Sequence, residues 1–380
     1  MKYFKKGAIV LAFLLPFIAY TKPSPGDGIT VFINVDVIPM DGSDRVINNA
    51  TVVIQQGTII EILPSGGFDP KSREVDQVID GQGKYLMPGL AEMHGHVPPT
   101  KPPVNAPSYM TEDYVKETLF LYVAAGVTTV RGMLGWADQL ELKQKVKEGD
   151  LVGPNLILAG PSFNGNSVSS AEQALQKVEQ QKKEGWDLLK VHPGLTRDEY
   201  DAMATRATRA TRATRATRAN ELNITFGGHV PQAVGIEHAL EMGQHTFDHM
   251  DGYVAYLQHL KEEELEKSMS EIIRLTKEKD AWIIPTQALW ETLIGAADYS
   301  AIQQYDELKY IPKSLRESYA NWVEANIGPG GTTMDGMAHA DLRQTLLKKM
   351  NDENVNLLMG TDAHSYSVCP VFPSTVNWRL

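Results

Sequence analysis

The sequence has a single cysteine, Cys369, among its 380 residues. One thiol cannot form an internal disulfide, so no disulfide framework exists and the compartment cannot be read from cysteine pairing. Positive charge is also scarce, because 36 lysines and arginines stand against 47 acidic residues and give a net charge of −11. An acidic chain repels the phosphate backbone, which argues against nucleic acid as a partner.

Long hydrophobic runs are lacking as well. The apolar run at residues 8–20 contains Pro16 and is shorter than the ~20 residues that span a bilayer. Three lysines precede it, and a basic stretch followed by a short apolar run is typical of a secretory signal. We predict that residues 1–21 are a signal peptide, that the protein is secreted or periplasmic, and that it has no stable membrane span. An uncleaved anchor is the alternative.

The composition is otherwise ordinary for a globular protein, with 42% apolar and 22% charged residues, and the length allows two or more domains. Residues 29–86 contain short β-branched runs broken by glycine, aspartate and asparagine, which is typical of antiparallel strands. The dipeptide Gln56-Gly57 predicts a tight hairpin. We interpret this region as the N-terminal part of a small β-sandwich that needs partner strands from elsewhere.

Residues 87–363 alternate apolar runs with helical stretches, which is the pattern of an α/β fold. Eight strands in this order predict a (β/α)8 TIM barrel, and no glycine-rich phosphate loop follows the first strand to favour a doubly wound sheet. The predicted strands are Leu90–His94, Thr128–Met133, Asn155–Ala159, Asp187–His192, Asn223–His229, His245–His249, Ala281–Thr286 and Asn356–Thr361.

Two connections between these strands are unusual. Residues 289–355, between the seventh and eighth strands, are longer than one helix and rich in tryptophan and tyrosine. They could form a lid over the barrel mouth or a peripheral helical insertion. The triplet Ala-Thr-Arg occurs five times over residues 204–218, and we interpret it as a repeat expansion that lengthens a helix and has no chemical role.

The motif that organises the site is His94-Gly95-His96 at the end of the first predicted barrel strand. Side chains at i and i+2 of a strand point to the same face, so both imidazoles can reach one metal ion. An H-x-H pair also arises by chance in a chain with ten histidines. The residues at the other strand ends therefore distinguish a metal site from a chance H-x-H pair.

Four further strands place groups at the same end of the predicted barrel. Lys190 lies among apolar residues of the fourth strand, where a lysine without a task is rare. The fifth strand ends at His229, the sixth at His249 and the eighth at Asp362. Six candidate ligands from five strands would converge at the barrel mouth.

The remaining candidates have weaker support. His192 could touch a substrate, and Arg131 could bind a substrate carboxylate or form a scaffold ion pair. Tyr253 is a further substrate-binding candidate. We expect His245 to share a face with His249 and to be a satisfied core residue deep in the strand. The other histidines are expected at the surface, on predicted helices or connections: His238, His259 and His339.

With these motifs in place, residues 29–363 resemble the amidohydrolase superfamily of metal-dependent hydrolases. Within it, they resemble the imidazolonepropionase-like group that includes secreted Xaa-Pro dipeptidases. The resemblance is carried by VIDGQGKYLMPGLAEMHGHV at the junction, GVTTVRGM on the second barrel strand, LLKVHPGLT on the fourth and GTDA on the eighth.

The resemblance implies a binuclear site for two divalent ions, with zinc the expected metal. His94 and His96 would hold the buried ion, His229 and His249 the second, and a carbamylated Lys190, formed with carbon dioxide, would bridge both. Asp362 would be ligand and proton shuttle for a hydroxide that attacks an amide or peptide C–N bond. The implied substrate is a small molecule or dipeptide. A homo-oligomer is left open.

The resemblance ends at residue 363, and residues 364–380 form a tail without helical or strand periodicity. The last barrel helix and the C-terminal strands of the sandwich are expected to be missing. One alternative is therefore a catalytically impaired, truncated relative that binds metal or a partner chain. Another is a mononuclear deaminase or cyclic-amide hydrolase.

Overall fold

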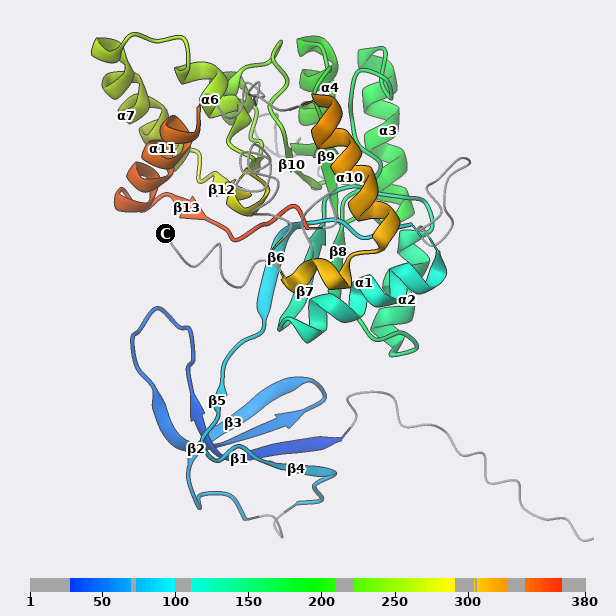
Figure 1. Ribbon diagram of the computed structural model, residues 1–380, viewed down its shortest axis with the longest axis vertical. Helices are drawn as coiled ribbons and strands as arrows, with labels where there is room; N and C mark the ends of the chain where they lie inside the picture. The colour runs from blue at the N-terminus through cyan, green and yellow to red at the C-terminus, as the bar shows by residue number, and fades with distance from the viewer. Residues whose placement is uncertain are drawn as a thin grey trace, which may run out of the picture. The chain divides into compact units, whose positions relative to one another are not determined.

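A computed structural model shows two compact units, residues 1–88 and 89–380, which we describe separately (Figure 1). The predicted signal peptide, most of the Ala-Thr-Arg repeat and the tail after residue 363 lie outside the described residues. The structure describes residues 28–69, 73–99, 111–208, 222–290, 304, 306–326 and 339–363.

The described part of the first unit is one five-stranded sheet in the order β3-β2-β1-β4, with β5 also paired to β1. The Gln56-Gly57 hairpin between β2 and β3 is confirmed, and both residues have positive φ, as tight hairpins with right-handed twist require. The strands are β1 (Ile29–Val37), β2 (Ile47–Gln55), β3 (Thr58–Pro64), β4 (Gln77–Asp80) and β5 (Tyr85–Leu86).

The expectation that all these strands are antiparallel was wrong for two of them. β4 and β5 run parallel to β1. A parallel neighbour needs a crossover connection rather than a tight turn, and the connection between β3 and β4 supplies it. Alternation of apolar residues, which is the same for both directions, could not reveal the difference.

The second unit contains all eight predicted barrel strands, each parallel to its neighbour. They form a three-stranded sheet, β6-β7-β8, and a five-stranded sheet, β9-β10-β11-β12-β13. Their bounds are β6 (Leu90–Gly95), β7 (Val127–Gly132), β8 (Asn155–Leu158), β9 (Leu188–Val191), β10 (Thr225–Gly228), β11 (Thr246–Asp248), β12 (Trp282–Ile284) and β13 (Asn356–Leu357).

Backbone contacts join the two sheets at both edges. A parallel bridge between Ala159 and Leu188 links β8 to β9. At the other edge, the segment after β13 meets β6, because Met93 N donates to Met359 O at 3.0 Å and Asp362 N donates to His94 O at 2.8 Å. The predicted (β/α)8 barrel is therefore confirmed.

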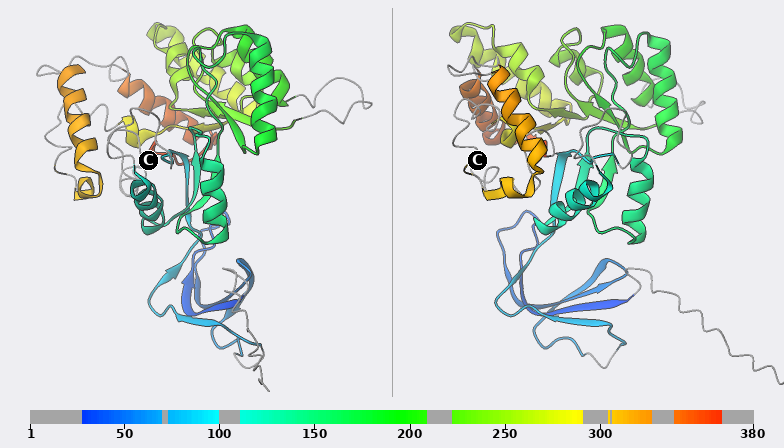
Figure 2. Two further views of the ribbon diagram at one scale, coloured as in Figure 1. Left: turned by 90° about the vertical axis from the view of Figure 1, so that its right-hand side faces the viewer. Right: turned by 45° about the vertical axis from the view of Figure 1, so that its right-hand side comes forward.

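Helices surround the strands, as Figure 2 shows from two further directions. Thr111 and Ser170 cap the N-termini of α1 and α3, and glycines in the left-handed conformation end α2 and α3. The described helices are α1 (Glu112–Ala124), α2 (Gln139–Glu148), α3 (Ala171–Glu184), α4 (Arg197–Thr208), α5 (Ile236–Glu241), α6 (Asp251–Leu257), α7 (Glu262–Glu278), η3 (Asp306–Tyr310), α10 (Lys313–Asn326) and α11 (Ala340–Asp352).

Several of these helices bury part of their surface, namely α1, α2, α3, α5, α6, α7 and α11. The largest apolar cluster combines Leu189, Phe226 and Phe247 from the strands with Tyr200 and Ile273 from the helices. Among the described residues, no helix has both the length and the apolar content to cross a bilayer. This apolar cluster therefore lies between the strands and the helices.

Both unusual connections are helical where the structure describes them. Ala204 to Thr208, the first residues of the Ala-Thr-Arg repeat, complete α4. Between β12 and β13 the chain forms η3, α10 and α11, the last two drawn in orange and red in Figure 1. The lid hypothesis for this connection remains a prediction.

Gly228, at the end of β10, offers a test of how tightly the strands approach. Its φ is +126°, and a Cβ there would lie 2.4 Å from Val191 O and 3.0 Å from Lys190 Cδ. We expect Gly228→Ala to lower the free energy of unfolding by more than the ~1–3 kcal/mol of backbone strain alone. Gly185→Ala, at φ +97° with nothing within 4 Å, should cost about 1 kcal/mol. Equal losses in urea denaturation would contradict the close approach.

Candidate metal centre

All six predicted ligands lie at the C-terminal ends of the barrel strands. His94 and Lys190 lie within β6 and β9, and their side chains are fully buried. The other four, His96, His229, His249 and Asp362, follow the last residues of β6, β10, β11 and β13. This edge of a (β/α)8 barrel is where its active sites are built.

Their side chains meet at contact distance. Asp362 Oδ1 lies 2.6 Å from His96 Nε2 and 3.7 Å from His94 Nε2. Lys190 Nζ lies 3.5 Å from His94 Nε2. The ligand atoms of His94, His249 and Asp362 all lie within 4.8 Å of one another, and the His229 and His249 ring centroids are 4.5 Å apart. The structure therefore brings the six residues together.

Three of the histidines have an oxygen atom within 3 Å of Nδ1. Asp248 Oδ2 lies 2.9 Å from the Nδ1 of His94, and Asp251 Oδ2 lies 2.5 Å from that of His229. The Nδ1 of His249 lies 2.8 Å from Thr286 Oγ1. Partners of this kind fix the ring and leave Nε2 as the available ligand atom.

Backbone conformation delivers two ligands that strand alternation alone would misplace. His249 and Asp362 have φ values of 64° and 62°, in the left-handed region that non-glycine residues rarely adopt. Within β11, the residues that face the barrel interior are Thr246 and Asp248, which contact Arg131 and His94. His249 reaches the site because the chain turns just after the strand.

The expectation for His245 was therefore wrong. It precedes β11, and its side chain is exposed rather than buried in the strand. His259 is exposed as expected, whereas His238 and His339 are half-buried. His238 is held between Asp201 Oδ1 at 2.6 Å and Arg197 at 2.7 Å, which makes it a scaffold residue of α5.

Burial controls the charge of the cluster. It lowers the pKa of His94 and His249 well below the usual range, and the positive charge of neighbouring groups adds to the effect. Burial also lowers the pKa of Lys190, against the opposing charge of Asp248. Burial alone would raise the pKa of Asp248, but Lys190 and Arg131 outweigh it and lower that pKa.

This donor set fits divalent metal ions. Neutral imidazoles and carboxylates are the nitrogen and oxygen ligands of zinc-like ions, and metal binding requires deprotonated ligands. Oδ1 of Asp248 is buried and has no hydrogen-bond partner among the described residues. A buried carboxylate oxygen left unpaired is costly unless positive charge lies nearby, as a bound ion would provide.

Glu92 is a buried carboxyl group that the sequence analysis missed. Its Oε1 accepts hydrogen bonds from His94 N at 2.8 Å and from Thr361 N at 3.0 Å, while Thr361 Oγ1 donates to Oε2. It thereby joins the first barrel strand to the segment that carries Asp362. Strand alternation could have indicated it, because Glu92 lies two residues before His94.

The candidate substrate residues fare differently. The His192 ring centroid lies 5.1 Å from that of His229, so this histidine borders the cluster. Burial lowers the pKa of His192 to about 3, so it is neutral at physiological pH. Arg131 is buried and donates to Met93 O at 3.1 Å and Thr246 Oγ1 at 2.8 Å, which supports a scaffold role through neutral acceptors rather than through the expected ion pair.

The prediction that Tyr253 binds substrate is contradicted by its position. Tyr253 is fully buried in α6, its ring packs against Phe247 and its hydroxyl group lies 2.9 Å from Thr276 Oγ1. Phe247 faces the helices, because its neighbours Thr246 and Asp248 face the barrel interior. Tyr253 therefore belongs to the core outside the strands.

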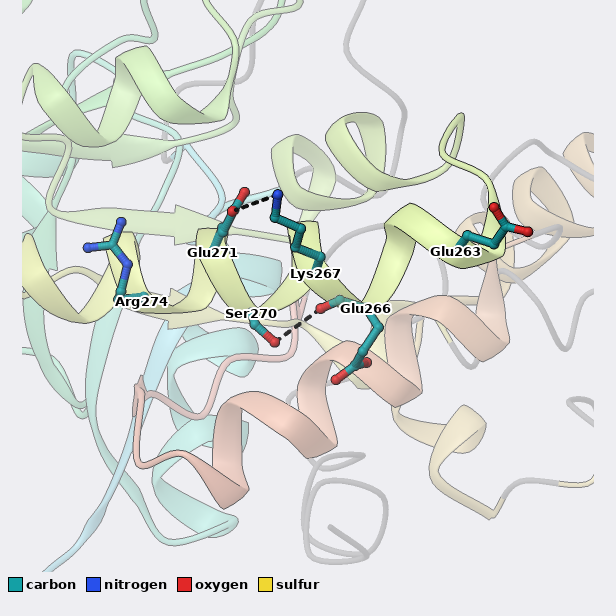
Figure 3. A pocket seen from close by; sticks show the side chains of 6 residues that line it. All are labelled: Glu263, Glu266, Lys267, Ser270, Glu271 and Arg274. Carbon is teal, nitrogen blue, oxygen red and sulfur yellow. Dashed lines mark hydrogen bonds and ion pairs between the residues drawn. The ribbon is translucent and has the colours of Figure 1, made fainter.

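Other charged clusters do not share this geometry. Figure 3 shows a hollow on the surface of α7 lined by charged and polar side chains, with Lys267 paired to Glu271. Within the part of the chain that the structure describes, the group of His94, His249 and Asp362 is the one arrangement of three or more ligands close enough for a metal ion.

Comparison with known proteins identifies the fold. No family model matches the chain. A crystal structure of a Xaa-Pro dipeptidase with bound methionine matches with a TM-score of 0.60 and 18% identity, over 90% of this chain and 80% of that one. Bottromycin amidohydrolase matches with a TM-score of 0.59 and 19% identity, over 90% and 70%. The chain has the amidohydrolase fold.

Two further comparisons bear on this amidohydrolase fold. A putative prolidase from Bifidobacterium longum matches with a TM-score of 0.60 and 19% identity, over 91% of this chain and 76% of that one. In sequence, 5-methylthioadenosine/S-adenosylhomocysteine deaminase of Bacillus cereus (strain B4264) is 37% identical over 68 residues. That match covers 18% of this chain and 15% of the deaminase. The resemblance to the amidohydrolase superfamily is thus confirmed for the fold.

The buried carboxyl group of Glu92 predicts a pH dependence of stability in the metal-free protein. Burial raises its pKa to about 7, against the hydrogen bonds from Thr361 and His94. Since the folded-state pKa exceeds the unfolded value of 4.5, this contribution is fully present below pH 4.5 and is lost as the pH rises through about 7.

Glu92→Gln mimics the protonated group and should remove this loss. We expect its melting temperature to equal that of the wild type near pH 4 and to exceed it by a few degrees, at about 2–4 °C per kcal/mol, near pH 8. Glu263→Gln, on the exposed face of α7, should show no such divergence. A constant difference between Glu92→Gln and wild type across this range would contradict the buried, protonated state.

Proposed function

We propose that this protein is a metal-dependent hydrolase that cleaves C–N bonds in small molecules, with dipeptides as its substrate class. The observation that carries the proposal is the meeting of His94, His96, Lys190, His229, His249 and Asp362 at the barrel mouth. The fold shared with a Xaa-Pro dipeptidase and a prolidase supports the dipeptide class. Export would follow from the predicted signal peptide.

The histidines would divide between two ion positions. His94 and His96, on β6, would hold the deeper ion, and His229 and His249 the other, with zinc the expected metal for a nitrogen-rich set. Divalent ions bound there supply a water of lowered pKa as nucleophile and polarise the substrate carbonyl group. Asp248, Asp251 and Thr286 would keep the imidazole rings oriented throughout.

Lys190 would complete the site as a carbamate. The neutral amine attacks the carbon of carbon dioxide, a C–N bond forms and one proton leaves. The burial that lowers the pKa of Lys190 favours this neutral amine. A carbamate presents two oxygen atoms to the site in place of the ammonium group and reverses the sign of its charge.

Asp362 would move the proton. Its Oδ1 atom, next to His96 Nε2, can accept the proton of the attacking water and deliver it to the leaving nitrogen. His192, beside His229 and neutral, could contact the substrate without adding charge. Each of these residues comes from a different strand end, so the barrel rather than one loop sets the geometry.

A deaminase with a single ion is the second candidate. The short match to the 5-methylthioadenosine/S-adenosylhomocysteine deaminase and the tight grouping of His94, His249 and Asp362 favour it. Both candidates hydrolyse a C–N bond. They differ in ion number and in the need for a carbamate at Lys190.

The metal content of the purified chain distinguishes the candidates. We expect about two zinc ions per wild-type chain by elemental analysis and at most one in Lys190→Met, because the bridging group is lost. Lys348→Met, at an exposed lysine of α11, should match the wild type. Two ions in Lys190→Met would refute the bridging carbamate, and less than one ion with no cooperative melt in the wild type would refute a working metal site.

Hydrolysis assays test the role of Asp362. We expect the zinc-loaded wild type to cleave dipeptides from a library ending in proline, arginine or lysine, and Asp362→Asn to lose ~10²–10⁴-fold in kcat, as for removal of a general acid–base. Release of ammonia from adenosine derivatives, with no dipeptide cleavage, would favour the deaminase. Cleavage by Asp362→Asn at the wild-type rate would exclude Asp362 as the proton carrier.

A further inference from the structure

Arg343 is a buried cation on α11 whose contacts all lead to the metal centre. Its NH1 donates to the carbonyl oxygen of His249, and its NH2 lies 3.9 Å from Asp251 Oδ1. The guanidinium carbon lies 3.6 Å from the ring centroid of Trp290, within stacking distance. Asp251 is the residue that holds the ring of His229. One side chain thus contacts one candidate ligand and the partner of another.

The carbonyl oxygen of His249 receives a second donor from the same connection. Trp290 Nε1 donates to it at 3.2 Å. Trp290 follows β12, and Arg343 lies in the helix that precedes β13, so the two ends of the long connection meet at a single oxygen atom.

Such a contact is important at this backbone position. His249 and Met250 both have positive φ, at 64° and 61°, a pair of strained residues that persists when surroundings fix them. Two donors on the carbonyl between them fix that peptide plane. Because the plane sets the direction of the His249 side chain, loss of the donors would let the ring move.

We propose that Arg343 is a positioning residue for His249 and His229, through which the connection between β12 and β13 sets the affinity for the ion that those histidines hold. This inference rests on the proposed function, because it presupposes that the centre binds metal. Arginine suits the role, since its planar fork can donate in two directions while its face stacks on an indole ring. A lysine could supply charge but neither the fork nor the stacking.

The alternative is that Arg343 only attaches α11 to the barrel. The two roles make different predictions for zinc binding. A structural attachment would lower stability and leave the affinities for both ions unchanged. A positioning role would weaken the ion held by His229 and His249 and leave the ion held by His94 and His96.

The experiment is a zinc titration of the metal-free protein by calorimetry, with Arg343→Met as the main variant. We expect the first ion to bind as in wild type and the second ~10–100-fold more weakly, the usual effect of losing a residue that orients a ligand. Arg343→Lys should recover part of the loss. Arg274→Met is the matched control, because Arg274 lies on α7 (Figure 3), is exposed, and pairs with Glu278 of the same helix.

If Arg343→Met binds each of the two ions with the same affinity as the wild type, the inference is overturned and the proposed function is unaffected. If wild type binds no zinc, the metal centre fails and the inference fails with it. Should Arg343→Met not fold, as judged by its thermal melt, Trp290→Phe decides. It removes one donor and keeps an aromatic face, so a several-fold weaker second ion supports the inference and an unchanged one overturns it.

Discussion

The cost of burying ionisable groups is the constraint on which the rest of this barrel depends. His94, Lys190 and Asp248 are almost completely removed from solvent inside one ring of strands. Each would be destabilising alone, because burial disfavours charge and leaves polar atoms unpaired. They are tolerated because they contact one another and because a metal ion can complete their coordination.

The same constraint explains the second layer of residues around the ligands. Oriented imidazole rings need oxygen atoms close to Nδ1, and Asp248, Asp251 and Thr286 place them there from three different segments. Arg343 and Trp290 in turn hold the backbone that carries His249. The site is therefore a network that extends into the helices, and the ligands are its central members.

Much of this arrangement could be predicted from the sequence. Short apolar runs alternating with helical stretches predicted the eight strands, because burial on both faces demands continuous apolar residues. The same-face rule grouped His94 with His96 and placed Lys190 in the interior. Glycines near the ends of the fifth and eighth predicted strands marked where the strands end, and His229 and Asp362 follow them. These are properties of short segments, and short segments are what a sequence displays directly.

The predictions that were wrong concern features set by single backbone angles or by contacts between residues distant in the sequence. The alternation rule paired His245 with His249, but the positive φ of His249 reverses its side chain, and no local pattern announces that turn. Tyr253 was predicted to bind substrate, but it lies on the helix side of the strands. Tertiary packing decides which face of α6 is buried, and the local sequence does not show it. The parallel direction of β4 and β5 depends on a crossover that alternation cannot reveal.

The link between Glu92 and Thr361 has a consequence for the order of folding. These residues are 269 positions apart, and their hydrogen bonds close the ring between its first and last strands. Contacts of such long range form late, because the entropy of closing the loop must be met before the contact stabilises anything. On the ribosome His94 emerges long before Asp362. The cluster of candidate ligands is therefore complete only after the eighth strand has been synthesised and has docked, so a metal ion that needs the full cluster would bind at the end of folding.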